Sequence, residues 1–158
     1  MKITLTVSLM LLSIIAYSQK DPCKDVKKNY DEFKKTTTYK IKPINGFLNV
    51  ELYREISAEK TDDRMLVHFP VSYSDYDITQ AFIKFNGDKI LPAKVISGRS
   101  SYISGSYHCM AVLLIDDDIR DQLLVNRISK FRIGAFDQSV NDKHADKTIE
   151  AAKCIFKD

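Results

Sequence analysis

Apolar and polar side chains alternate with a period of two through most of the chain. Alternation of this kind places one face of a half-buried strand against a core. The pattern predicts six or seven strands, in the segments Thr36–Lys42, Leu48–Tyr53, Met65–Val71, Ala81–Phe85, Ile90–Val95, Tyr107–Ile115 and Ser129–Phe136. Asn86 and Gly87 separate two of these strands and predict a tight hairpin, because both turn positions favour a positive φ.

Residue patterns that fit a helix occur in two segments of the chain, and a third segment is ambiguous. Asp116–Asp118 offer an N-cap and acidic first-turn residues before an apolar pattern, which predicts a short helix. Ala145–Phe156 carries apolar residues on one face and predicts a closing helix. Lys24–Lys35 is ambiguous, since its apolar residues also fit a short helix. Ser97–Ser106, rich in serine and glycine, is predicted to be a loop.

These elements predict a mainly β fold. We expect an antiparallel β-sandwich or a strongly curved sheet, with the short helix and the C-terminal helix packed on it. An α+β class is the alternative. The chain does not alternate strands and helices, which argues against a Rossmann-type or barrel enzyme. No repeat or linker divides it, so residues 19–158 are expected to form one domain.

The first residues have the pattern of a secretory signal peptide. Lys2 precedes the uncharged, mostly apolar run Ile3–Ile15, and Ala16–Ser18 place small residues where a signal peptidase cleaves. The run is short for a membrane span of about 20 residues. We expect residues 1–18 to be removed, although an N-terminal membrane anchor is the alternative. The mature chain is then secreted or periplasmic, with no membrane span.

Composition and charge narrow the classes of function. Hydrophobic residues make up 44% of the chain, which excludes a disordered protein. The formal net charge is +3, and loss of Lys2 lowers it by one. Basic residues near the mature start are interspersed with acidic ones and fit a solvated face. No nucleic-acid partner is therefore expected.

The three cysteines all lie in the mature part of the chain. Exported proteins meet an oxidising compartment, which permits a disulfide. Cys109 lies in a strand that is expected to be buried, whereas Cys23 and Cys154 lie near the two mature ends. A Cys23–Cys154 bridge is therefore expected, with three free thiols as the alternative. His108 and Cys109 are adjacent on a strand, so they point to opposite faces and do not predict a catalytic dyad.

Motifs for catalysis, metal binding or cofactor binding are missing from the sequence. His68, His108 and His144 are isolated along the chain, and no metal-ligand or nucleotide-binding spacing occurs. Asp116–Asp118 fit helix capping better than calcium binding, and Asp75 and Asp77 fit a solvated loop better than a cation site. We predict no catalytic residue, no metal and no cofactor.

Tyrosine-containing loops are the main candidate for binding. Tyrosine supplies contact area, and neighbouring serine and glycine supply adaptable hydrogen bonding. Backbone N–H groups around Arg99 could also hold an anion, although a flexible loop is the simpler interpretation. The predicted ligand-binding residues are Tyr73, Tyr76, Arg99, Tyr102 and Tyr107. Ordinary loop composition, with tyrosine rings covering the core edge, is the alternative.

The layout of the chain resembles a group of small secreted proteins from Bacteroidota-type bacteria. The features that carry the resemblance are a signal ending at Gln19, the Asn86–Gly87 hairpin, and the segments Asp31–Thr38, Asn126–Ile133 and Ala151–Ile155. The resemblance implies an exported protein of mixed β architecture. The group has no assigned activity, so it implies no catalytic residue.

Three classes of function remain. The first is a non-enzymatic module that binds a protein or a glycan through its loops. The second is a hydrolase with an unrecognised active site, which predicts a cleft holding a histidine beside a carboxylate or Cys109. The third is an envelope-associated structural subunit, which predicts an apolar patch or an unpaired edge strand. The absence of catalytic motifs favours the first.

Overall fold

The computed structural model describes residues 21, 23–75 and 77–156. The expected signal peptide, residues 1–18, and the predicted binding residue Tyr76 lie outside the described residues. Within the described part, no helix has the length and apolar composition needed to cross a membrane.

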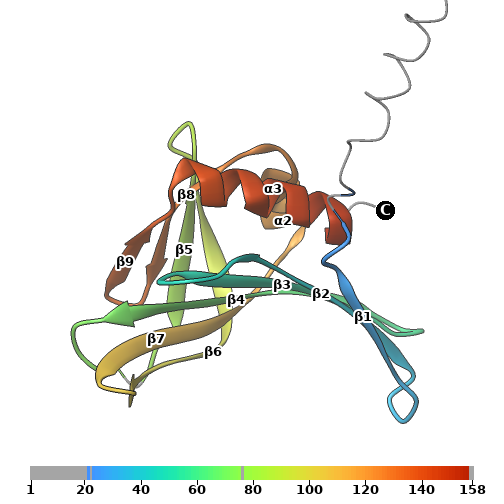
Figure 1. Cartoon of the computed structure of the whole chain (residues 1–158), viewed down its shortest axis with the longest axis horizontal. Coiled ribbons are helices and arrows are strands. Elements are labelled where there is room, and N and C mark those ends of the chain that lie inside the picture. Colours follow the sequence, from blue (N-terminus) through green and yellow to red (C-terminus); the bar gives the residue numbers. More distant parts are fainter. Residues whose placement is uncertain (1–20, 22, 76, 157–158) are drawn as a thin grey trace, which may run out of the picture.

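In the described residues, nine antiparallel strands form one sheet, and two helices pack on it (Figure 1). The strands are β1 (Lys27–Asp31), β2 (Thr36–Ile44), β3 (Asn49–Ile56), β4 (Thr61–Val71), β5 (Gln80–Phe85), β6 (Ile90–Ile103), β7 (Ser106–Leu114), β8 (Ile128–Ile133) and β9 (Phe136–Ser139). The helices are α2 (Asp117–Val125) and α3 (Asp142–Phe156). The strand order is β1-β2-β3-β4-β7-β6-β5-β8-β9. The mainly β prediction is confirmed, and the sheet is single and curved rather than a sandwich of two.

A bend in the long strand β6 produces this curvature. The first half of β6 pairs with β5, and the second half pairs with β7. At the start of the second half the register shifts, since Val95 pairs with Leu113 while Ser97 pairs with Val112. An extra residue in one strand bends it and increases its twist. One continuous strand therefore joins two halves of the sheet that face different directions.

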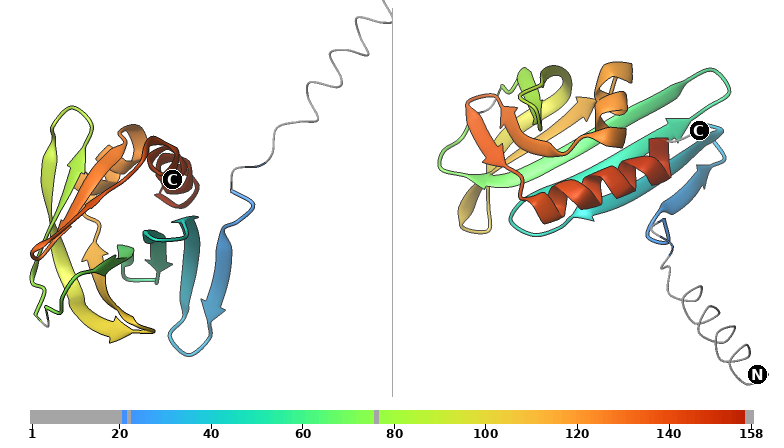
Figure 2. Two further views of the ribbon diagram at one scale, coloured as in Figure 1. Left: turned by 60° about the vertical axis from the view of Figure 1, so that its left-hand side comes forward. Right: turned by 90° about the horizontal axis from the view of Figure 1, so that it is seen from above.

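Helix α3 lies across the gap between the two ends of the curved sheet (Figure 2). It contacts β2 and β3 on one side and β8 and α2 on the other. Its inward face carries the buried residues Ala145, Thr148, Ala151, Ala152, Ile155 and Phe156. These residues complete a core built from inward-facing positions of most of the strands, among them Leu52, Met65, Phe85 and Phe131.

The ends of the described chain are joined covalently. Cys23, just before β1, forms a disulfide with Cys154 near the end of α3. The predicted Cys23–Cys154 bridge is thus present, and Cys109 is a buried free thiol. Disulfides persist in oxidising compartments, so the bridge indicates an oxidising environment for the protein.

The short helix begins as its sequence predicts. The side chain of Asp116 accepts a hydrogen bond from the backbone N–H of Ile119 at 2.9 Å. Asp117 and Asp118 follow in the first turn, where negative charge is favourable. The Asp116–Asp118 run is therefore explained by helix capping.

One segment differs from its prediction, and strand pairing decides the structure of a second segment whose sequence pattern is ambiguous. Ser97–Ser106 is not a loop, because β6 continues through it to Ile103 and turns into β7 at Ser104 and Gly105. The segment Lys24–Lys35 contains no helix, because Lys27–Asp31 pairs with Thr36–Lys40 as an edge hairpin. In both cases pairing with a neighbouring strand decides the structure, and local composition does not report that pairing.

A buried ion pair lies inside the end of the sheet near α2. Arg54 on β3 donates from Nε and one terminal nitrogen to the two carboxylate oxygens of Asp63 on β4, at 2.9 and 3.0 Å. Both side chains are almost fully buried. Arg120 of α2 lies 3.5 Å from the same carboxylate, and the Arg54 guanidinium lies 5.5 Å from the ring of Phe156. The network ties both helices to the sheet.

Candidate functional site

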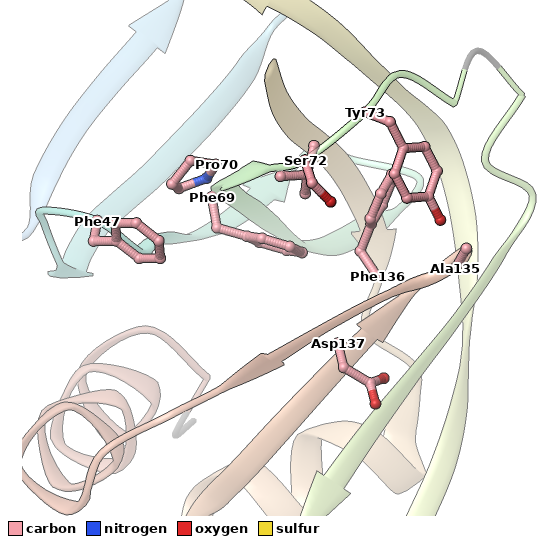
Figure 3. A pocket seen from close by; sticks show the side chains of 9 residues that line it. Phe47, Phe69, Pro70, Ser72, Tyr73, Ala135, Phe136 and Asp137 are labelled. Atoms are coloured by element: carbon pink, nitrogen blue, oxygen red, sulfur yellow. The ribbon is translucent and has the colours of Figure 1, made fainter. Parts of the chain in front are cut away.

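A groove lined by aromatic side chains lies where three connections of the sheet meet. It has a volume of about 510 Å³. We call it the aromatic groove, and its lining residues are Phe47, Phe69, Pro70, Val71, Ser72, Tyr73, Ala135, Phe136 and Asp137. Figure 3 shows Phe47, Phe69 and Pro70 on one side and Phe136 on β9 beside Tyr73. Pockets for small ligands and for side chains of partners are typically lined in this way.

Phe47 is presented to solvent by a fixed turn between β2 and β3. Gly46, with a φ of 146°, begins the turn. The side chain of Asn49 accepts from the Gly46 N–H at 3.1 Å and donates to the Gly46 carbonyl at 3.0 Å. Phe47 is 70% exposed at the rim of the groove. Burying such a ring on binding would remove a large apolar surface from water.

Tyr73 lies in the β4–β5 connection, which is held against β6. The Ser100 N–H donates to the Asp75 carbonyl at 2.8 Å, and the Ser100 hydroxyl accepts from the Asp75 N–H. Gly98 lets the connection approach closely, since a Cβ there would lie 2.8 Å from the Ile78 carbonyl oxygen. The Tyr73 ring packs on Phe136 with their centroids 4.9 Å apart. The groove is therefore shaped before any ligand arrives.

One carboxylate borders the groove, and its charge is neutralised locally. Asp137 accepts from Arg132 at 2.7 and 2.9 Å, and Lys130 lies 3.7 Å away. The hydrogen bond from Arg132 lowers the pKa of Asp137 below its usual value, so the group is ionised at neutral pH. A carboxylate held in this way presents little net charge to a ligand.

The predicted binding residues do not all meet in the groove. Tyr73 lines it, whereas Tyr102 and Tyr107 face each other across the β6–β7 hairpin with their centroids 5.1 Å apart. Arg99 lies on β6 opposite Met110. Among the described residues, no ring contact links the Tyr102–Tyr107 pair to Tyr73.

Sequence reasoning missed the other groove residues. Phe47, Phe69, Phe136 and Asp137 come from separate connections and strand ends, and only the folded sheet brings them together. One signal was available. Phe47 is a large apolar residue in a turn after Gly46, where polar residues are usual.

Two histidines that are isolated in the sequence are neighbours in the fold. His68 on β4 and His108 on β7 have ring centroids 5.0 Å apart. Each has one nitrogen near a polar side chain, Asn49 at 3.4 Å for His68 and Ser106 at 2.8 Å for His108. Burial, then the charge of His108, lowers the pKa of His68 below its usual value. His68 is thus neutral at pH 7.

The free cysteine Cys109 is not an activated nucleophile. Cys109 is buried, and burial raises the pKa of its thiol to about 12, which leaves it protonated and unreactive. Within residues 21, 23–75 and 77–156, no group of three or more His, Cys, Asp or Glu side chains could hold a metal ion. Asp75 and Asp77 are joined by a local hydrogen bond from the Asp77 N–H to the Asp75 carboxylate, at 3.4 Å.

No known protein family, curated protein or solved structure matches this chain.

Proposed function

We propose that the chain is an exported, non-enzymatic binding module and that the aromatic groove binds a protein partner. The observation that carries the proposal is the pre-formed groove of about 510 Å³, with Phe47 exposed at its rim. Interfaces between proteins are centred on aromatic anchors in pockets of this kind. Export is supported by the signal pattern of residues 1–18 and by the disulfide, and the resemblance to secreted Bacteroidota-type proteins agrees with it.

The chemistry of the groove fits a protein partner better than it fits a hydrolase active site. Catalysis of hydrolysis generally needs an activated nucleophile or a pair of titratable groups facing the substrate. The groove offers one carboxylate, Asp137, and Arg132 already neutralises it. The exposed ring of Phe47 and the half-exposed ring of Tyr73 offer a broad apolar contact, which an apolar side chain of a partner would cover.

The test is site-specific photo-cross-linking in the organism that produces the protein. The cross-linking amino acid p-benzoylphenylalanine replaces Phe47 or Tyr73 in separate variants. A third variant carries it at Phe33, which is 100% exposed in the β1–β2 turn. That turn lies on the opposite side of the molecule from β9, which borders the groove (Figure 1). Adducts are separated under denaturing conditions and identified by mass spectrometry.

We expect a protein adduct of one discrete mass from positions 47 and 73 and not from position 33. The same adducts from all three positions would mean non-specific contact and would refute the proposal. No adduct at 47 or 73, or an adduct that contains only carbohydrate, would also refute it. The last result would identify a glycan ligand instead.

A further inference from the structure

Strand β9 forms one border of the aromatic groove and is also an edge of the sheet. Phe136 and Asp137 of β9 line the groove, and Figure 3 shows β9 running along it. In the described part of the chain, β9 has a strand neighbour on one side only, which is β8. Its other edge therefore lies alongside the groove.

The hydrogen-bond pattern shows which backbone groups of β9 face this open edge. In a two-residue hairpin the two residues that flank the turn exchange hydrogen bonds, and here these are Ile133 and Phe136. Hydrogen-bonded pairs then alternate with non-hydrogen-bonded pairs along the two strands. The Val140 N–H donates to the Ser129 carbonyl at 2.9 Å, which continues this alternation. The N–H and C=O groups of Asp137 and Ser139 thus point away from β8.

One of these outward groups already has a substitute partner. The side-chain amide of Gln138 donates to the Ser139 carbonyl at 2.9 Å. A neighbouring strand would supply its own N–H at that position. A side chain can give way to a backbone donor at little cost, because one hydrogen bond replaces another.

The two edges of the sheet differ in how they are protected. Edge strand β1 carries Lys27 and Lys28, and edge lysines discourage pairing with another chain. On β9 the only charged residue is Asp137, and Arg132 and Lys130 neutralise it. The β9 edge therefore lacks a free charge that would repel an incoming strand.

We infer that the protein partner binds as an extended strand added to the β9 edge, an inference that rests on the proposed function. The Asp137 and Ser139 backbone groups would bond to alternate residues of that strand, which recur about every 6.8 Å along an antiparallel strand. Alternate side chains of the added strand point to one face. An aromatic or large aliphatic side chain on that face enters the groove beside Phe136 and Phe47, and this commits the partner to an extended polypeptide.

The test combines the cross-linker at Tyr73 with a change in the β9 backbone. Ser139→Pro removes the outward N–H, and proline is tolerated at edge positions whose N–H faces solvent. Ser139→Ala keeps the N–H and is the matched control. We expect Ser139→Pro to lower the yield of the adduct by about tenfold, the equivalent of one lost hydrogen bond of ~1.4 kcal/mol, and Ser139→Ala to leave it unchanged.

Urea denaturation of both variants shows whether each is folded. If folded Ser139→Pro cross-links as well as Ser139→Ala, strand addition is refuted while the binding function stands. If the cross-linking variants that keep Ser139 give no adduct from position 47 or 73, the proposed function itself is refuted.

Amide hydrogen exchange on the purified complex gives a second readout that needs no proline. We expect the Asp137 and Ser139 amides to exchange at least tenfold more slowly in the complex than in the free protein. The Phe136 and Gln138 amides already bond to β8 and serve as internal controls. Unchanged exchange at Asp137 and Ser139 would refute strand addition even if Ser139→Pro did not fold.

Discussion

Removing the buried carboxylate of Asp63 should destabilise the protein severely. In Asp63→Asn the shape of the side chain is kept, but the guanidinium of Arg54 loses the carboxylate charge to which it donates at 2.9 and 3.0 Å. Arg54 is 7% exposed and Asp63 is 4% exposed, so water cannot replace the lost partner. Arg120 loses the same carboxylate, 3.5 Å away.

The size of the loss in the free energy of unfolding follows from the burial of the Arg54–Asp63 pair. Breaking a buried ion pair by removing one partner costs about 3–5 kcal/mol. Domains of this size are stable by about 5–15 kcal/mol, so the loss is a large fraction of the total. At roughly 3–5 °C per kcal/mol, the midpoint of thermal unfolding should fall by about 9–25 °C.

The assay is urea denaturation followed by circular dichroism, with Asp137→Asn as the matched control. Asp137 also accepts two hydrogen bonds from an arginine, but that pair is exposed and should contribute less than about 1 kcal/mol. The double variant Arg54→Met, Asp63→Leu removes both charges and should recover most of the stability lost in Asp63→Asn. A loss below about 1 kcal/mol for Asp63→Asn would refute the assignment of a buried, structurally essential pair.

Three further predictions concern single residues. Gly98→Ala should lower the free energy of unfolding by about 1–3 kcal/mol, because its Cβ would meet the Ile78 carbonyl; a stability equal to the unmodified protein in urea would contradict this. The lowered pKa of His68 favours the neutral form in the folded state, so its contribution is full above about pH 6.5 and is lost as the pH falls through its folded pKa. His68→Gln should therefore flatten the decline in stability between about pH 7 and 5 measured by thermal melts, and an equally steep decline would disprove it. Cys109 should resist iodoacetamide at pH 8 in the native protein and react once the chain is unfolded, as mass spectrometry would show; rapid native labelling would exclude a buried thiol of pKa about 12.

Much of the fold could be predicted because its signals are local. Alternation within Leu48–Tyr53 and Met65–Val71 indicates strands whatever their neighbours are. Asp116 caps a helix through a bond within its own first turn. The Cys23–Cys154 bridge was predicted from the general proximity of chain ends.

The remaining features depend on contacts between distant segments. Ser97–Ser106 has the composition of a loop, and it is a strand because it pairs with β7 and because Ser100 bonds to the β4–β5 connection. The aromatic groove arises in the same way. Phe47, Tyr73 and Phe136 line one groove only because the sheet curls, and the bend in β6 that curls it leaves no distinctive sequence pattern.

The Cys23–Cys154 disulfide also determines how the protein responds to mechanical tension. A force applied between residues 23 and 154 passes through the covalent bond and leaves the intervening loop, residues 24–153, unloaded. The hydrogen-bond ladders, the buried Arg54–Asp63 pair and the groove are all within that loop. A chain held at one end while being pulled at the other would therefore keep the aromatic groove intact until the bridge is reduced.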